Sequence, residues 1–445
     1  MAWQARVRIA SQLCVCHHTC NPVCCEIVSP VETHARGLLS EVDADSAQHA
    51  LSSLRVDSAT GPDMLPTRVL RFCACALALP VARLASCILR TGRWPETWIE
   101  HWIVPLYKRK VVYDPGNYRG VHLTAQISKV VERMLSKRFV PHLCRQLSFG
   151  PNQFAYQKER GARDALAYLT LSWFHEMCRR MKVGVYCSDV SGAFDRVCLP
   201  RLVAKLQAAG LCAEVVSLLS SWLRKRVARV VVEGDKSAEM ELANMVFQGT
   251  VWGCILWNVF YADSRRAIEE TGHEEIVYAD DLNAWKVYGA NVANSEVMAE
   301  SAMCQANLHE WGGANRVSFD PSKESKHVLS FTQPAGGNFR ILGALYDPSL
   351  AMKDAVVEVA AQCRWKLQTL LRSRRFYCDA DMVMMYKSHV LSYIEYKTPA
   401  LYHACATVLA DIDVVQRRFM SEIGISEIDA LMAFRLAPLR TVTLQ

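Results

Sequence analysis

Two short strand patterns in the middle of the chain each end in aspartate, and they constrain the fold more than any other feature. Residues 183–187 alternate apolar with small or polar side chains and lead into Ser188 and Asp189. Residues 275–279 form a second such pattern, which ends at Asp280 and Asp281 and is followed by a third over 282–287. The spacing predicts adjacent carboxylates at a hairpin tip, in a sheet that brings Asp189 to the same edge.

Three carboxylates at one sheet edge repel one another unless a cation neutralises them, and this predicts a metal site. Two Mg²⁺ ions about 3.5–4 Å apart, clamping the attacking and leaving oxygens, are what phosphoryl transfer to the end of a nucleic acid requires. The alternative is a set of solvated turn aspartates, because an Asp-Asp pair arises about once by chance in a chain of this composition.

The remaining patterns mix strands with helices. Helical periods run through residues 65–89 with a break at Pro80, 125–139, 163–179, from Pro200 onward, 291–311, and from Val356 to about 434. Further strand patterns cover 230–232 and 239–245 around a turn at Gly234, and 340–346. We therefore expect an α+β core with an α-helical C-terminal region, and little structure in residues 1–50.

Positive charge is concentrated rather than spread over the 445 residues. The chain holds 51 Lys and Arg against 44 Asp and Glu, a net charge of +7. Residues 106–145 contain nine basic and two acidic side chains, so this basic window alone matches the excess of the whole chain. A second cluster lies at Arg224, Lys225, Arg226 and Arg229. Such clusters are typical of a groove that binds a polyanion, and the alternative is a solvated helix face.

The 18 cysteines are scattered among apolar stretches and stay below the density of a disulfide scaffold. Reduced cysteine behaves there as a small hydrophobic residue, which favours an intracellular protein, nuclear or cytoplasmic and not secreted. The Cys- and His-rich residues 14–25 have zinc-ligand types without the spacing of a zinc finger, so we expect an unstructured extension there.

No membrane partner is expected from the apolar stretches. The longest nearly uncharged ones, residues 72–82 and 251–262, are shorter than the roughly 18 apolar residues that a spanning helix needs.

A series of motifs in a fixed order runs from about residue 58 to the C-terminus. It comprises GPD at 61–63, NYRGVHL at 117–123, FGPNQF at 149–154, RGA at 160–162, SDVSGAFDRV at 188–197, FQGTVWG at 247–253, YADD at 278–281, 319–323 and Leu342-Gly343. In this order the motifs resemble the reverse transcriptases of non-long-terminal-repeat (LINE-type) retrotransposons, and the wording is most similar to the elements of trypanosomatid protozoa.

The resemblance implies the fold of a right-hand polymerase, with fingers, a palm built on an antiparallel sheet, and a thumb. It implies that residues 51–160 form the fingers, 161–346 the palm, interleaved with the fingers, and 347–445 a helical thumb or connection, after a poorly structured leader over 1–50. The basic window would then line the template and triphosphate side of the fingers, and the helices after Asp354 would grip duplex product through phosphate contacts.

Matched residue by residue, the resemblance implies that Asp189, Asp280 and Asp281 are the catalytic carboxylates. They would hold two Mg²⁺ ions, or Mn²⁺ in their place. Lys108 and Arg119 would hold the incoming triphosphate, as a point charge and a bidentate fork respectively. Lys323 would be a further triphosphate-binding or proton-donating residue.

The resemblance also implies which residues shape the nucleotide pocket. Phe194, five positions after Asp189, would screen the sugar and leave no room for a 2′-hydroxyl, which favours deoxynucleotides; the alternative for Phe194 is a core aromatic. Gln248 and Gly249 would line the pocket, the glycine letting the backbone approach the substrate. Asp195 is expected to be structural.

The implied function is that of an RNA-directed DNA polymerase, which transfers a nucleotide from a dNTP to a primer 3′-hydroxyl by the two-metal route. Its partners would be an RNA template, a DNA primer or target, and dNTPs. Proteins of this family are longer, with an endonuclease before the polymerase and often a ribonuclease H or zinc-knuckle region after it. None of these is recognisable here, so we expect a truncated copy.

Two alternatives stay open beside this function. Phe247 and Cys254-Ile255-Leu256 stand where the family usually has prolines, and these changes would reshape the nucleotide pocket without touching a metal ligand. One alternative is a decayed retrotransposon copy that binds nucleic acid without polymerising. The other is a maturase-like relative that binds RNA.

Overall fold

The chain forms two compact units, each built from several separated segments. The computed structural model describes residues 41–109 and 111–436. Unit 1 takes its described residues from Met1–Pro151, Val190–Arg265 and Glu310–Ser318, and unit 2 from Asn152–Asp189, Arg266–His309 and Phe319–Gln445. Three elements run from one unit into the other: α11 (Ser264–Glu269), α12 (Asn294–Asn315) and β10 (Ser318–Phe319).

Helix α3 (Ala44–Ser52) begins the described part of unit 1. Asp43 caps it, because its Oδ1 accepts a hydrogen bond from the Ser46 backbone N at 2.6 Å. The helix packs on α5 and α6 through its buried apolar face. The expectation of little structure is therefore wrong for residues 44–50, while residues 1–40 of the expected leader, with the Cys- and His-rich start, lie outside the described residues.

The helix expected over residues 65–89 is in fact two helices, α4 (Thr67–Phe72) and α5 (Ala74–Thr91). The break falls at Cys73 and not at Pro80. Pro80 lies inside α5 on its exposed side, where water can satisfy the carbonyl that loses its partner. Gly92 ends the helix in the left-handed region at φ +61°.

By length and composition alone, α5 is long and apolar enough to cross a membrane. Such helices are weak indicators, because a core helix has the same composition. The residues that α5 buries pack against α3, α6 and α9 (Ala213–Leu223) within unit 1.

A mixed sheet with the strand order β2-β1-β5-β6 lies in unit 1, and β7 also pairs with β5. Its strands are β1 (Glu100–Tyr107), β2 (Tyr118–Leu123), β5 (Arg226–Val232), β6 (Asp235–Lys236) and β7 (Met240–Leu242). β1 and β2 are antiparallel, whereas β1 and β5 are parallel. The strands expected on either side of Gly234 are confirmed, with the short β6 between them.

Helices from three parts of the chain share the aromatic core of unit 1. These helices are α6 (Gln126–Arg145), α9 and α10 (Val251–Tyr261). Unit 1 also contains α8 (Leu199–Ala208) and the short strand β4 (Val190–Ser191). The buried ring of Trp252 contacts those of Trp222 and Phe139, with ring centroids 5.4 and 5.8 Å apart. The helices expected over residues 125–139 and from Pro200 are confirmed, and α6 continues past Pro141.

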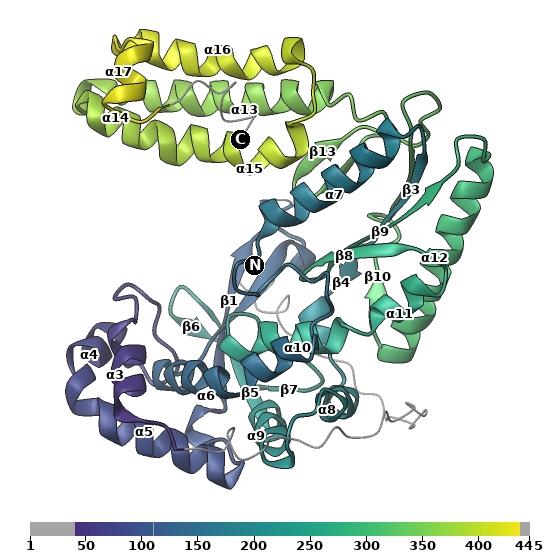
Figure 1. The fold of residues 1–445 in the computed structure, drawn as a ribbon. Helices are drawn as coiled ribbons and strands as arrows, with labels where there is room; N and C mark the ends of the chain where they lie inside the picture. Colours follow the sequence, from purple (N-terminus) through teal and green to yellow (C-terminus); the bar gives the residue numbers. More distant parts are fainter. Residues whose placement is uncertain (1–40, 110, 437–445) are drawn as a thin grey trace. The chain divides into compact units, whose positions relative to one another are not determined.

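Unit 2 contains an antiparallel four-stranded sheet with the order β11-β3-β9-β8, of which β3, β9 and β8 are labelled in Figure 1. Its strands are β3 (Lys182–Cys187), β8 (Glu274–Tyr278), β9 (Asp281–Tyr288) and β11 (Ser325–Leu329). All six residues of β3 are buried, although the sequence alternates, because both faces are covered. Helix α7 (Ala162–Cys178) packs against Val183 and Val185, while α12 lies so close to the other face that a Cβ on Gly184 would meet Val297 Cγ1 at 2.6 Å.

The strand expected over residues 340–346 is a hairpin instead. β12 (Phe339–Ile341) and β13 (Ala344–Tyr346) pair around Leu342 and Gly343, both at positive φ. From there to residue 436, the last that the structure describes, the regular elements are all helical, as expected from the sequence. They are α13 (Lys353–Leu371), the 3-10 helix Arg374–Phe376, α14 (Asp379–Tyr386), the π-helical Lys387–Leu391, α15 (Ser392–Leu401), α16 (Ala406–Ile423) and α17 (Glu427–Met432). Tyr386 and Phe419 stack at 4.1 Å in the core of these helices.

Candidate active site

The two adjacent aspartates lie at the tip of the β8–β9 hairpin in unit 2. Tyr278 pairs with Asp281, so Ala279 and Asp280 form a two-residue turn. Ala279 adopts φ +62°, a left-handed conformation that a residue with a side chain adopts only where its surroundings hold it. Asp280 is therefore in the turn itself, and Asp281 is the first residue of β9.

The buried Gln153 side chain holds this turn. Its Oε1 accepts a hydrogen bond from the Ala279 backbone N at 2.9 Å, and its Nε2 donates to the Ala279 backbone O at 3.3 Å. The backbone of Asn152 and Phe154 also bonds to Val277 on β8. One amide side chain thus satisfies both polar groups of the residue that shapes the turn.

Strand β3 brings Asp189 to the neighbouring position. β3 pairs with β9 up to Cys187 and Asn283, and both the N and Oγ of Ser188 donate to the Leu282 backbone O at 3.0 Å. Asp189 follows directly, so its carboxylate leaves the sheet beside the hairpin tip, as the sequence predicts.

The electrostatics of Asp281 show that the three carboxylates share one environment. Burial, together with the carboxylates of Asp280 and Asp189, raises the pKa of Asp281 to about 6, against a hydrogen bond that Asn283 Nδ2 donates at 2.9 Å. Charge at Asp281 is therefore unfavourable without a compensating cation.

Lys323 supplies one such cation at Asp189. Its Nζ lies 2.6 Å from Asp189 Oδ2 and 3.1 Å from Asp320 Oδ2. The hydrogen bond to Asp189 raises the pKa of Lys323. Among the residues that the structure describes, no three His, Cys, Asp or Glu side chains form a recognisable metal-ligand group.

Gly249 lies at the start of α10 in unit 1, against the backbone of β2. It has φ +98°, and a Cβ there would lie 3.0 Å from the His122 backbone O. The preceding Gln248 accepts a hydrogen bond through its backbone O from His122 N at 2.8 Å. Only glycine fits this position without a shift of β2, so the glycine is required by the fold as well as by the pocket that the resemblance implies.

Phe194 is anchored to the same region of unit 1. Its backbone O accepts from Val246 N at 2.8 Å, and its ring stacks on the buried Trp257 of α10 with centroids 5.9 Å apart. The ring is partly exposed, so it is neither a free surface side chain nor a fully buried core residue.

The side chain of Glu132 binds the N-terminus of α10, which follows Gln248 and Gly249 in the chain. Its buried Oε2 accepts from the backbone N of Val251 at 2.9 Å, and its Oε1 from Trp222 Nε1 at 3.3 Å. Burial raises the pKa of Glu132, against these hydrogen bonds. A carboxylate at a helix N-terminus is favourable, and here it fixes where the helix starts.

Lys108 and Arg119 lie on the β1–β2 hairpin of unit 1. Leu106 pairs with Arg119, and Lys108 N continues the ladder by bonding Asn117 O at 2.8 Å. Because strand residues alternate between faces, Arg119 and Lys108 share one face, and both side chains are exposed. The Lys108 ammonium donates to the Gly116 backbone O at 2.9 Å.

The predicted site residues thus fall into two groups. Unit 2 brings together Asp189, Asp280, Asp281 and Lys323. Unit 1 holds Phe194, Gln248 and Gly249 around the start of α10, and Lys108 and Arg119 on the hairpin.

Two residues with a structural role at the unit 2 site were not singled out from the sequence. Gln153 lies within the FGPNQF motif, but nothing in that motif shows which backbone its amide reaches. Glu324 follows Lys323 directly, and its burial depends on side chains from β3 and α12.

A family of known proteins matches the part of the chain that carries the three aspartates. Residues 107–314, just under half of the chain, match the family described as "Reverse transcriptase (RNA-dependent DNA polymerase)". This region is similar to that family, and the match includes Asp189, Asp280 and Asp281.

Curated proteins with similar sequences carry matching names. The "RNA-directed DNA polymerase from mobile element jockey" of Drosophila funebris is 23% identical over 86% of this chain and 44% of the relative. The protein of the same name from Drosophila melanogaster is 27% identical over 55% of this chain and 27% of the relative. The "Retrovirus-related Pol polyprotein from type-1 retrotransposable element R1" of Bradysia coprophila is 25% identical over 62% of this chain and 27% of the relative.

The names of these relatives assign them to mobile or retrotransposable elements. The chain spans less than half the length of each of them.

Proposed function

We propose that this chain is an RNA-directed DNA polymerase of a non-LTR retrotransposon. The observation that carries the proposal is the edge of the unit 2 sheet, where Asp189, Asp280 and Asp281 meet within a domain of the reverse transcriptase family. The substrates would be an RNA template, a DNA primer or target, and dNTPs.

The three aspartates would hold two Mg²⁺ ions, or Mn²⁺ in their place. Their carboxylate oxygens are the ligands that these ions prefer, and the pKa of Asp281, which burial and the carboxylates of Asp280 and Asp189 raise, supports a site that a cation would stabilise. The ammonium already bound to Asp189 also shows that this position attracts a cation. When bound, the ions would lower the pKa of the primer hydroxyl and stabilise the leaving pyrophosphate.

The remaining predicted residues would bind the nucleotide. Lys108 and Arg119 would hold the triphosphate, and Lys323 would contact it or donate a proton. Gln248 and Gly249 would shape the pocket, and the Phe194 ring would exclude a 2′-hydroxyl. The partial exposure of Phe194, with one face on Trp257, supports this role.

We further propose the right-hand arrangement for the whole chain. Fingers would comprise residues 51–160, the palm 161–346, and a helical thumb or connection 347–445. The antiparallel sheet that carries the aspartates and the helices that follow β13 support this assignment. An intracellular location, nuclear or cytoplasmic, is supported by the buried thiols of Cys187, Cys304 and Cys363, which form no disulfide.

Primer extension on an RNA template with Mg²⁺ tests the function directly. The expected result is incorporation of deoxynucleotides in preference to ribonucleotides, with loss of extension in Asp280→Asn. Asp235→Asn is the matched control, because Asp235 lies exposed on β6 in unit 1, outside the residues that we assign to the site. Extension that survives Asp280→Asn would contradict the metal-site assignment.

Primer extension combined with RNA-binding and splicing assays separates the alternatives. Absence of extension together with RNA binding that weakens steeply with salt would favour a decayed copy. Absence of extension together with promotion of intron splicing would favour a maturase-like protein.

A further inference from the structure

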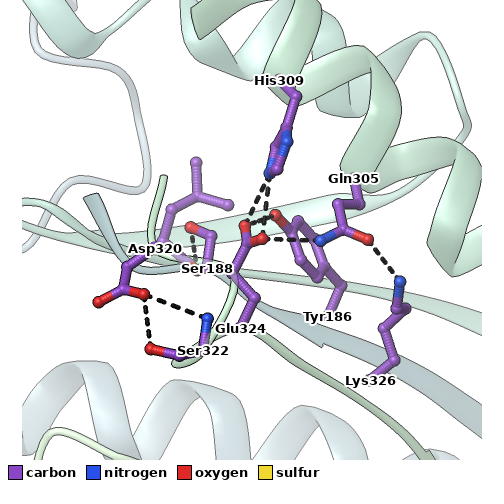
Figure 2. A network of polar contacts seen from close by, with 9 residues as sticks. Tyr186, Ser188, Gln305, His309, Asp320, Ser322, Glu324 and Lys326 are labelled. Carbon is purple, nitrogen blue, oxygen red and sulfur yellow. Dashed lines mark hydrogen bonds and ion pairs between the residues drawn. The ribbon is translucent and has the colours of Figure 1, made fainter. Parts of the chain in front are cut away.

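Glu324 has a buried carboxylate in unit 2 that the proposed function does not use. Its side chain is 3% exposed. Tyr186 Oη donates to Oε1 at 2.5 Å, Gln305 Nε2 donates to Oε2 at 2.7 Å, and His309 Nε2 donates to both oxygens at 2.9 and 3.1 Å (Figure 2). A buried carboxylate with this many donors is a fixed point, because moving it would leave every donor unpaired.

The donors come from two elements outside the 320–324 segment. Tyr186 is on β3, three residues before Asp189, and Gln305 and His309 are on successive turns of α12 (Figure 2). The His309 ring also stacks on Phe319, with ring centroids 4.9 Å apart and planes 6° from parallel. Glu324 is therefore fixed relative to the strand that delivers Asp189.

A tight turn connects this fixed point to Asp189. The backbone N of Asp320 donates to the Asp189 backbone O at 2.9 Å, and the backbone N of Lys323 donates to the Asp320 O at 3.0 Å. Asp320 Oδ1 accepts from the backbone N and Oγ of Ser322 at 3.1 and 2.6 Å. The segment 320–324 is thus held by Asp189 at its start and by Glu324 at its end.

Lys323 is the residue whose position this arrangement determines. It lies between the two fixed ends, its side chain is about half exposed, and its Nζ reaches Asp189 Oδ2 at 2.6 Å. A long, flexible lysine side chain in solvent gains little from one ion pair unless its backbone is already in place.

We propose that Glu324 is a positioning residue, whose buried carboxylate holds the 320–324 turn so that the Lys323 ammonium is delivered to Asp189. The proposal rests on the proposed function in one respect, since Asp189 is taken as a catalytic carboxylate. Glu324 touches neither substrate nor metal in this scheme, and it acts only through Lys323.

Chemical labelling of lysine tests the positioning without any need for polymerase activity. Amine-reactive esters modify the unprotonated amine, so a lysine held on a carboxylate reacts slowly. Lys158, with 92% of its side chain exposed, serves as an internal reference, because its 3.1 Å ion pair with Glu159 is itself exposed to solvent. In the wild type we expect Lys323 to be labelled several-fold more slowly than Lys158, as measured by mass spectrometry of the digested protein.

Glu324→Gln should release Lys323. The glutamine amide has one acceptor oxygen where the carboxylate has two. Its NH₂ group would face the donor groups of Gln305, Tyr186 or His309, so at least one of their hydrogen bonds would be lost. We expect the labelling rate of Lys323 to rise about tenfold, with no change at Lys158. Tyr186→Phe, which removes a single hydroxyl, is the second variant should Glu324→Gln fold poorly. Unchanged labelling of Lys323 in a folded variant would overturn the proposal.

Glu358→Gln is the matched control for this experiment. It removes a carboxylate in the same unit that bonds Arg340 at 2.5 and 3.0 Å, outside the 320–324 turn. Labelling of Lys323 should equal that of the wild type in this variant. A rise as large as in Glu324→Gln would show a general loosening of unit 2, which contradicts a specific role of Glu324.

Kinetics with combined variants give a second test. If Glu324 acts through Lys323, then Glu324→Gln should lower kcat for primer extension in the wild type but should have no further effect in Lys323→Met. Equal losses in both backgrounds would indicate a merely structural role. If the wild type does not extend primers, the proposed function fails, whereas the labelling result still decides the role of Glu324.

Discussion

The Gln153 side chain bonds both the N–H and the C=O of Ala279, so one amide fixes the turn that carries Asp280. Gln153 is buried, and its Oε1 also accepts from the Ala155 backbone N at 2.9 Å. The turn is therefore held from a second segment of the chain and not by the hairpin alone. This explains how Ala279 keeps a left-handed conformation.

Gln153→Ala should weaken both the turn and the activity. It removes the two hydrogen bonds that Gln153 makes to the backbone of the buried Ala279, at a cost of about 1–3 kcal/mol in the free energy of unfolding. Because Asp280 would lose its fixed position, kcat for primer extension should fall more than KM for dNTP rises. Urea unfolding and steady-state extension measure the two effects. Gln362→Ala, at an exposed position on α13, is the control, and wild-type extension by Gln153→Ala would refute the prediction.

Stability should fall as the pH is lowered from 7 to 5 because of His122. Burial, then Arg226 and Lys129, lower the pKa of His122 to about 3, whereas the unfolded side chain titrates near 6.5. Below pH 6.5 the unfolded state therefore binds a proton that the folded state does not. The contribution of neutral His122 to the free energy of unfolding is therefore complete above pH 6.5. It falls by up to about 1.4 kcal/mol per pH unit as the pH is lowered to about 3.

His122→Gln checks this assignment, because glutamine does not titrate. Urea midpoints at pH 7 and pH 5 should differ less in the variant than in the wild type. His101, whose pKa burial also lowers, keeps part of the dependence. An identical pH dependence in the two proteins would show that His122 contributes nothing.

The parts of the site that sequence could predict are those encoded by local pattern and motif order. Asp189 at the end of β3 and the Asp280-Asp281 tip follow from strand periodicity, and their meeting follows from the pairing of β3 with β9. The roles of Lys108 and Arg119 came from resemblance alone, and their shared hairpin face remains consistent with them.

The parts that sequence could not predict depend on distant contacts. Gln153 and Ala279 are 126 residues apart, and the burial of Glu324 requires β3 and α12 together. Distant contacts also explain why all of β3 is buried. Its alternating sequence pattern predicts one exposed face, but α7 and α12 cover both faces. Local propensity also misplaced the helix break at Pro80, because an exposed proline is tolerated inside α5.

Phe194→Val should relax the selection against ribonucleotides, given the proposed function. The smaller side chain opens space beside Trp257 where the resemblance places the sugar. We expect the ratio of kcat/KM for dNTP to that for rNTP to fall about tenfold or more. Phe331→Val, at an exposed phenylalanine in unit 2, is the control. An unchanged ratio would mean that Phe194 is a packing residue only.

Arg226→Met should destabilise unit 1 strongly. The Arg226 side chain is buried, with Nε donating to Trp222 O and Nη1 to Trp98 O at 2.5 Å, and with Nη1 3.1 Å from His101 Nε2. Burial lowers the pKa of Arg226 to about 9, against the charge of Glu132. Removing the guanidinium takes a stabilising positive charge from the buried Glu132 and a donor from each of two carbonyls, which should cost about 3–5 kcal/mol.

Urea unfolding of Arg226→Met and Arg229→Met measures this cost against a matched control. Arg229 lies on the same strand, β5, but is partly exposed, and its contacts with Glu100 and Glu239 are solvent-accessible ion pairs. Its loss should cost less than about 1 kcal/mol. Because Glu132 also fixes the start of α10, Arg226→Met should lower dNTP affinity as well, whereas Arg229→Met should not. Equal destabilisation by the two variants would contradict the role given to Arg226.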